Sequence, residues 1–183
     1  MDSTTRMHLD GLRSGDREQE NAAFSYFTDA TLVPVDWAYD VWDDMVGMLR
    51  SASNRQRAIA AQTLCGLAGS DPEERILRDF GALLEVTRDE RFVTARHCMQ
   101  SLWKVGAAGE KQREMLVAGL AGRFGECSTE KNRTLIRYDI IESLRKLYDR
   151  TADGSVREQA LELIGTEEDP KYRKKYAGVW RGV

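Results

Sequence analysis

The sequence predicts an all-α protein, an α-α superhelix (solenoid) of about four to five antiparallel helix pairs. Apolar residues recur at helical spacing along nearly the whole chain. Runs of alternating β-branched residues and Asn-Gly hairpin turns are missing, so strand signals are weak. A leucine recurs at positions 64, 102 and 144, at steps of 38 and 42 residues. A period near ~40 residues with two helices in each unit is typical of helical repeat proteins.

The expected helices are bounded by turn and cap signals. Asp36 and Ser53 precede apolar runs and are expected as N-terminal caps. After a turn at 14–16, another helix is expected to begin at about Asp16. Asp-Pro pairs at 71–72 and 169–170 predict two more helix starts, and Ser155 is expected to open a capping box. The expected helices cover about residues 4–13, 16–30, 36–50, 53–68, 71–86, 90–106, 110–124, 129–149, 155–165 and 170–180.

The stretch Glu90–Gly106 is the clearest of these helices. Its predicted buried side carries Val93, Cys98, Leu102 and Val105, and Gly106 is expected to close it. Similar helices before and after it give the repeat its column of leucines. The other predicted helices therefore align with this one.

The charge of the chain is unevenly spread. The formal net charge is −3, but residues 1–90 carry 9 basic and 17 acidic side chains, and residues 91–183 carry 18 and 13. Residues 18–49 hold seven acids and no base, and residues 171–183 hold five bases and no acid. Such asymmetry concerns partners and electrostatic steering rather than fold.

The three cysteines are scattered, without a C-x-x-C pair, which argues against a disulfide framework and a zinc site. Cys65 and Cys98 are expected as small buried residues. The N-terminus lacks the apolar stretch of a secretory signal, and no run reaches the ~20 apolar residues of a membrane span. We therefore expect a cytoplasmic protein with no membrane contact.

The second helices of successive pairs align, with the first aligned position seven residues before the recurring leucine. Arg57, Leu64 and Leu67 align with Ala95, Leu102 and Val105, and then with Arg137, Leu144 and Leu147. With Val-Arg-like pairs at 56–57, 136–137 and 156–157 and the tail Leu-Trp-Lys-Val-Gly at 102–106, the chain resembles the HEAT-repeat family. Thr94-Ala95 departs from this pattern. The resemblance implies a single domain over 1–183, with an N-terminal capping unit (1–33), repeats (34–165) and a C-terminal capping helix (166–183).

In the HEAT-repeat family the second helices line a concave groove, and helical geometry gives their outward positions. The resemblance implies that a partner binds there, because an exposed Trp beside Arg, Tyr and Lys is the composition of a binding hot spot. The candidate partner-binding residues are Arg96, Gln100, Trp103, Lys104, Tyr138, Glu142, Arg145 and Lys146. The alternative is that Trp103 packs against the neighbouring helix and the charges form a solvated face.

Other polar groups favour structural roles. Arg57, Arg137 and Arg157 are expected to bond nearby acids or loop carbonyls, and the lone His8 and His97 carry no catalytic pattern. The acids and aromatic residues at 36–44 predict aromatic packing between the first units, with the acids facing water. The basic residues Lys171, Arg173, Lys174, Lys175 and Arg181 form either a solvated helix end or a site for phosphate or an acidic partner.

No catalytic or metal-binding signature occurs, so we expect a non-enzymatic interaction scaffold, without cofactor, that binds a protein or peptide partner in the concave groove. The alternative is a HEAT-like DNA-binding protein or DNA glycosylase of the alkylation-repair type, which an acidic pI of about 5.5 disfavours. A bilin-lyase-like or maturation-factor HEAT protein is also left open. We expect a monomer, with weak salt-sensitive association between the acidic and basic ends as the alternative.

Overall fold

The computed structural model describes residues 1–183, and it is all-helical without a strand, which confirms the predicted fold class. Its chain divides into two compact units, residues 1–101 and residues 102–183. Unit 1 contains α1 (Ser3–Arg13), α2 (Arg17–Ala30), α3 (Ala38–Met48), α4 (Asn54–Leu67), η1 (Ala68–Ser70), α5 (Arg75–Glu85), η2 (Val86–Arg88) and α6 (Phe92–Ser101). Unit 2 contains α7 (Trp103–Ala107), α8 (Glu110–Glu126), η3 (Cys127–Thr129), α9 (Arg133–Thr151), α10 (Gly154–Thr166) and α11 (Pro170–Val179).

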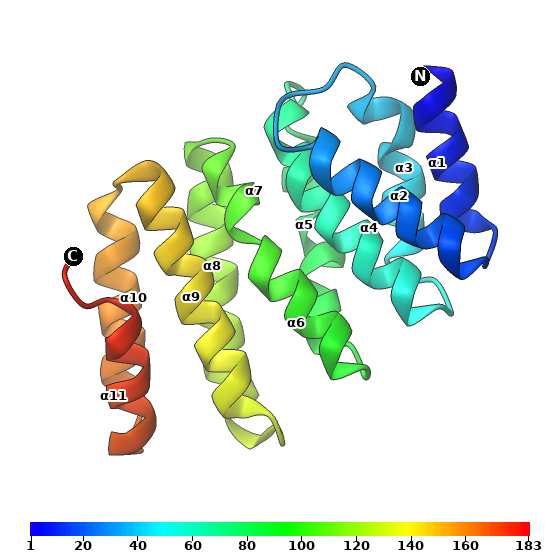
Figure 1. Ribbon diagram of the computed structural model, residues 1–183. Coiled ribbons are helices and arrows are strands. Elements are labelled where there is room, and N and C mark those ends of the chain that lie inside the picture. The colour runs from blue at the N-terminus through cyan, green and yellow to red at the C-terminus, as the bar shows by residue number, and fades with distance from the viewer. The chain divides into compact units, whose positions relative to one another are not determined.

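Within unit 1 the helices form two layers. Helix α4 packs between α2 and α6, and α3 and α5 lie behind them (Figure 1). Leu64 of α4 is buried in this core, together with Phe27 of α2 and Trp42 of α3. Because each helix buries one stripe against its neighbours, the layers depend on stacking.

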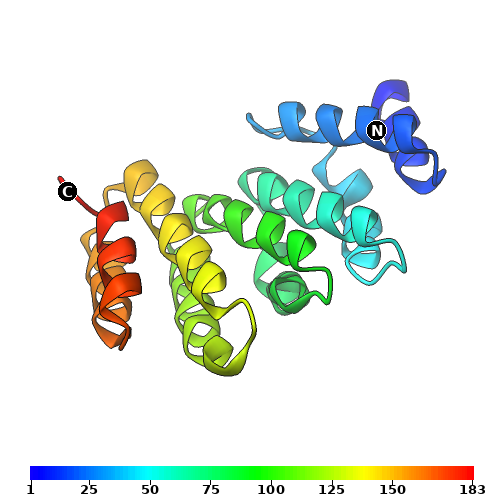
Figure 2. The same ribbon diagram turned by 60° about the horizontal axis from the view of Figure 1, so that its bottom comes forward.

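Unit 2 repeats this arrangement. Helix α9 packs between α7 and α11, and α8 and α10 form the second layer behind them (Figures 1 and 2). Leu102, Leu144 and Leu147 have no exposed surface. The predicted leucine column is therefore confirmed as core in both units.

The predicted helix starts at Asp16 and Asp169 are confirmed, and both aspartates are N-terminal caps. The Asp16 carboxylate accepts a hydrogen bond from the Gln19 amide, and that of Asp169 from the Lys171 amide, both at 2.9 Å. Ser53 also accepts from the Gln56 amide, at 3.4 Å. Each oxygen satisfies one of the amides that a first helical turn leaves unpaired.

Two other predicted caps are wrong, and a third helix begins later than predicted. Asp36 does not cap α3, whose N-cap Trp37 makes no side-chain cap bond. Asp153 caps α10 by accepting from the Ser155 amide, so Ser155 lies inside the helix. Asp71 does cap α5, but the helix begins only at Arg75, after a turn that follows Asp71. Its carboxylate accepts from the amides of residues 75 and 76 at 2.9 and 2.8 Å, and Glu74 before them is left-handed at φ 55°.

The stretch 90–106 differs from the prediction in two respects. It is divided at Leu102, where the Val105 amide bonds the Leu102 carbonyl at 2.9 Å and tightens the turn between α6 and α7. Val93 is 65% exposed, whereas Thr94 and Ala95 are buried. Val93 lies five residues before Cys98, about 140° around the helix, which places it off the buried stripe.

Candidate partner-binding site

The candidate residues belong to both units. Arg96 and Gln100 lie on α6 in unit 1, and the other six lie on α7 and α9 in unit 2. Within unit 2, α7 and α9 pack against each other, so Trp103 and Lys104 lie on a neighbour of the helix that carries Tyr138. Trp103 is half-buried and Lys146 is exposed. The partner-binding role of the eight residues stays a prediction.

Tyr138 occupies the junction of α9 and α11. The Lys175 ammonium lies 4.6 Å from the centre of the Tyr138 ring, and the Tyr176 ring centre lies 6.5 Å from it. Burial raises the pKa of Tyr138, and the neighbouring Glu142 carboxylate raises it further. The hydroxyl therefore stays protonated and can donate a hydrogen bond.

Arg145 is engaged within the fold. Its Nε donates to Asp149 at 2.7 Å, and its Nη1 donates to the Val179 carbonyl at the end of α11 at 2.9 Å. The guanidinium carbon also lies 5.8 Å from the centre of the Trp180 ring. Arg145 thus ties α9 to α11, a contact across 34 residues that helical spacing alone does not reveal.

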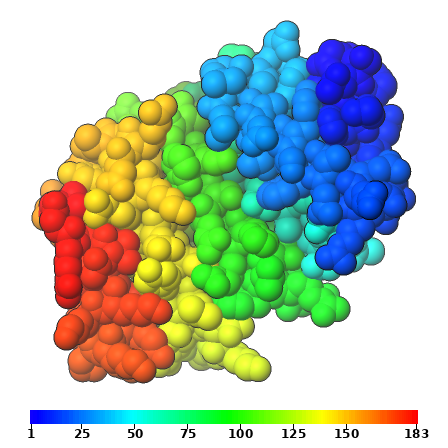
Figure 3. Space-filling model, viewed as in Figure 1, coloured from blue at the N-terminus to red at the C-terminus, as the bar shows by residue number.

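The basic residues of α11 are functional candidates that the predicted groove set did not include. Lys171, Lys174 and Lys175 are exposed, and the Lys171 ammonium lies 5.5 Å from the ring centre of half-buried Tyr172. Tyr176 anchors the helix, because its buried hydroxyl donates to the Thr134 carbonyl of α9 at 2.9 Å. Figure 3 shows α9 and α11 as adjoining parts of one surface. The absence of acids after residue 170 was the sequence signal for this face.

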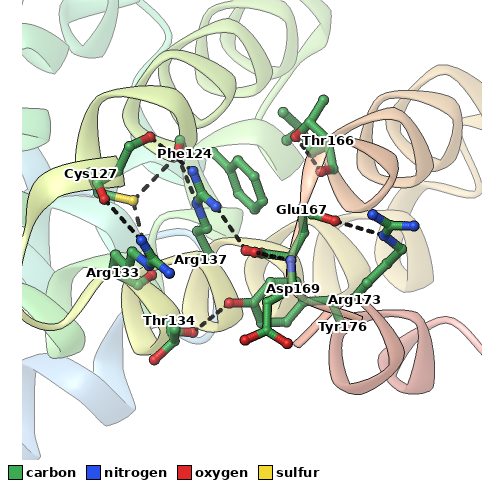
Figure 4. A network of polar contacts seen from close by, with 12 residues as sticks. Phe124, Cys127, Arg133, Thr134, Arg137, Thr166, Glu167, Asp169, Arg173 and Tyr176 are labelled. Atoms are coloured by element: carbon green, nitrogen blue, oxygen red, sulfur yellow. Dashed lines mark hydrogen bonds and ion pairs between the residues drawn. The ribbon is translucent and has the colours of Figure 1, made fainter. Parts of the chain in front are cut away.

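A cleft of about 720 Å³ in unit 2 lies beside a polar network that Arg137 organises. Arg137 donates to the Phe124 carbonyl at 3.2 Å and to Glu167 at 2.7 Å (Figure 4). It also donates to the Ser128 hydroxyl at 3.0 Å. Its guanidinium carbon also lies 4.6 Å from the centre of the Phe124 ring. These contacts direct its donors into the fold, which confirms the predicted structural role of this arginine.

The other repeat arginines also bond within the chain. Arg57 bonds Asp89 and two loop carbonyls, and Arg157 donates to the Val183 carbonyl at 3.2 Å. His8 stacks on Tyr26 with ring centres 4.3 Å apart. The structure contains no group of three or more His, Cys, Asp or Glu side chains arranged to hold a metal ion.

The aromatic residues at 36–44 pack as expected. Trp37 and Trp42 are buried, and the indole N–H of Trp42 donates to Asp79 at 2.9 Å. The acids of this segment at positions 36, 40 and 43 are exposed. Cys65, Cys98 and Cys127 are buried free thiols. None of the helices has the length and apolar character needed to cross a membrane.

No protein-family model and no curated protein matches the sequence. Solved structures match the fold. A designed armadillo repeat protein in complex with the peptide (KR)4 has a TM-score of 0.51 at 14% identity, and the match covers 98% of this chain and 88% of that one. The fold is that of a helical repeat protein.

Two crystal structures of engineered proteins also match this helical repeat chain, each with a TM-score of 0.52. One is 16% identical and is covered over 95% of its length, and the other is 15% identical and is covered over 57%. Both matches cover 98% of the present chain. At these identities the likeness concerns the fold.

Proposed function

We propose that this helical repeat protein is a non-enzymatic scaffold of the HEAT type that binds a protein or peptide partner on the face of its α7, α9 and α11 layer. The observation that carries the proposal is the junction of Tyr138 with Lys175, where an aromatic ring and an exposed ammonium from different helices lie 4.6 Å apart. Aromatic and basic side chains are the common anchors of protein interfaces.

The neighbouring helices extend this face. Half-buried Trp103 and Lys104 come from α7, and exposed Lys146 comes from α9. A partly covered Trp can contribute strongly to affinity, because its rigid ring loses little entropy on binding. The similarity to a repeat protein solved with a bound peptide supports this class of partner. The proposed setting is the cytoplasm, which suits three buried free thiols.

Selection from a displayed random-peptide library tests the proposal. We expect selected peptides to bind the wild-type protein, and Trp103→Ala to weaken them by at least about tenfold, as loss of an interface anchor does. Lys111→Ala changes an exposed residue of α8, in the other layer, and serves as the matched control. Circular dichroism verifies that both variants are folded.

Two results would contradict the proposal. One is peptide binding that Trp103→Ala leaves unchanged, since the partner would then bind elsewhere. The other is a mobility shift of duplex DNA that persists at moderate salt and is competed by no selected peptide. That result would favour a nucleic-acid partner.

A further inference from the structure

The face between α9 and α11 combines positive charge with aromatic rings. Residues 171–183 contain five bases and no acid, and the three lysines of α11 are exposed. The acids of this part of unit 2 are paired with arginines instead, Glu167 with Arg137 and Asp149 with Arg145. A row of exposed ammonium groups on an ordered helix is available to a ligand that carries carboxylates.

Two of the lysines form a regular pattern with tyrosines. Lys171 lies over Tyr172 and Lys175 lies over Tyr138, at 5.5 and 4.6 Å from the ring centres. Both distances are within the ~6 Å range of cation–π contact. The rings therefore hold the lysine side chains in place while the ammonium groups keep N–H donors for a ligand.

Helix α11, which carries this row, is anchored by contacts at both ends. Tyr176 is fully buried with its hydroxyl on the Thr134 carbonyl, and Arg145 bonds the Val179 carbonyl at the far end of α11. Asp169 and Glu167 fix the start of the helix, since the Asp169 carboxylate caps it and its amide donates to Glu167 at 3.1 Å. A surface held at both ends loses little entropy when a partner binds.

From this arrangement we infer that the partner segment bound at the α9–α11 face is an extended acidic peptide, with carboxylates at alternate positions. The inference rests on the proposed scaffold function and names its partner class. Side chains four residues apart on a helix are ~5–6 Å apart. Alternate residues of an extended chain are ~6.6 Å apart on one side. Two such carboxylates can therefore meet Lys171 and Lys175 together.

The same face disfavours a nucleic acid. Glu142 lies close enough to Tyr138 to raise its pKa, so a carboxylate lies beside the ring that Lys175 covers. A nucleic-acid strand carries a phosphate on every nucleotide, so it cannot omit charge opposite this carboxylate. A peptide can place a neutral residue there.

The test measures fluorescence anisotropy of a labelled peptide of alternating glutamate and serine at low and moderate salt. We expect this peptide to bind the wild-type protein, a matched lysine–serine peptide not to bind, and affinity to fall as salt rises. Lys171→Glu with Lys175→Glu should weaken binding by at least about tenfold. The control Lys111→Glu with Arg150→Glu makes the same change of net charge at exposed positions on α8 and at the end of α9, and should retain affinity within about threefold.

Each contrary result has a definite meaning. Equal weakening by both double variants shows attraction by net charge and overturns the site. An oligothymidine that binds as tightly as the acidic peptide overturns the peptide assignment. Salt-sensitive self-association in sedimentation velocity that is lost in Lys171→Glu with Lys175→Glu assigns the face to a second copy, through the acidic residues 18–49. If library-selected peptides bind through Trp103 while the glutamate peptide does not bind, the scaffold function stands and this inference fails.

Discussion

Arg57 and Asp89 are joined by two parallel N–H···O bonds, Nε to Oδ2 at 2.5 Å and Nη2 to Oδ1 at 2.9 Å. Their side chains are only 14% and 4% exposed. Arg57 lies near the start of α4, and Asp89 lies just before α6. The pair therefore holds the segment that leads into α6 against α4, its neighbour in the same layer. The remaining nitrogen of Arg57 donates to the Ser51 carbonyl at 2.8 Å.

Unit 2 contains the same relationship. Arg137 of α9 bonds Glu167, which is buried just before α11. A second pair in this unit uses a different element, because the exposed Glu130 before α9 is bonded by the buried Arg123 of α8. Ala95 stands where the repeat pattern has an arginine. An ion pair to an acid just before a helix therefore recurs at α6, α9 and α11, and the arginine comes from α4, α8 and α9 respectively.

Replacing Arg57 by alanine should destabilise unit 1. The change leaves the Asp89 carboxylate buried without its partner, and breaking such a pair costs about 3 kcal/mol. The free energy of unfolding in urea measures the effect. Arg50→Ala, at an exposed position in the turn after α3, is the control and should change stability by less than about 0.5 kcal/mol. Equal midpoints for wild type and Arg57→Ala would show that the pair contributes nothing.

The same carboxylate should make stability depend on pH. Burial pushes the pKa of Asp89 upward, but hydrogen bonds from Arg57 and the Arg91 amide outweigh it, so the pKa lies below its ordinary value. A lowered folded-state pKa gives stability that is present above the unfolded pKa of about 3.9 and is lost as pH falls through the folded pKa.

We therefore expect the difference in unfolding free energy between wild type and Asp89→Asn to be largest near neutral pH. It should shrink as the pH falls below about 4, because Asp89 is then protonated in the unfolded wild-type chain, and it should be lost once the pH is below the lowered folded-state pKa. Urea titrations across this range measure it. A difference that stays constant with pH argues against an ionised Asp89 as the stabilising group.

Gly106 should tolerate no side chain without loss of stability. A Cβ there would lie 2.8 Å from a methyl of Leu116 and 2.9 Å from one of Leu147, and both leucines are buried. Gly106→Ala should cost about 1–3 kcal/mol through overpacking. Gly122→Ala is the control, because that Cβ meets nothing within 4 Å on α8, and it should stabilise the helix by about 0.5–1 kcal/mol. Thermal unfolding of the two variants should shift in opposite directions.

Arg145→Ala should loosen α11. The substitution removes the bond to the Val179 carbonyl, a charge-assisted contact whose loss costs about 1.5–3 kcal/mol. Hydrogen exchange of the α11 amides should accelerate, whereas Lys146→Ala, exposed on the next position of α9, should leave it unchanged. Unchanged exchange in Arg145→Ala would show that Arg145 does not hold α11 in place, and would favour the partner-binding role that the sequence predicts.

The sequence by itself determined the helices, their order and most of their buried stripes. Leu64, Leu102 and Leu144 form core positions because residues three and four apart share one helix face, and this rule operates within a single element. The Asp16 and Asp169 caps follow from equally local chemistry. The structural roles of Arg57 and Arg137 could be predicted because both arginines occupy the same column of the repeat, whereas their partners Asp89 and Glu167 came from the structure.

Local rules misplaced Val93, which periodicity counts among apolar residues but which lies off the stripe that α6 buries. They also missed the turn between Asp71 and α5, because its geometry depends on a carboxylate that reaches two amides four and five residues ahead.

The candidate site was decided by tertiary packing. Tyr138 meets Lys175 across 37 positions, and Arg145 meets Val179 across 34, only because α9 and α11 lie side by side. Helical periodicity gives the face on which a residue lies, but not the residue on the next helix that it meets. That choice depends on how each helix is rotated and shifted against its neighbour, which the packing of buried side chains such as Tyr176 sets.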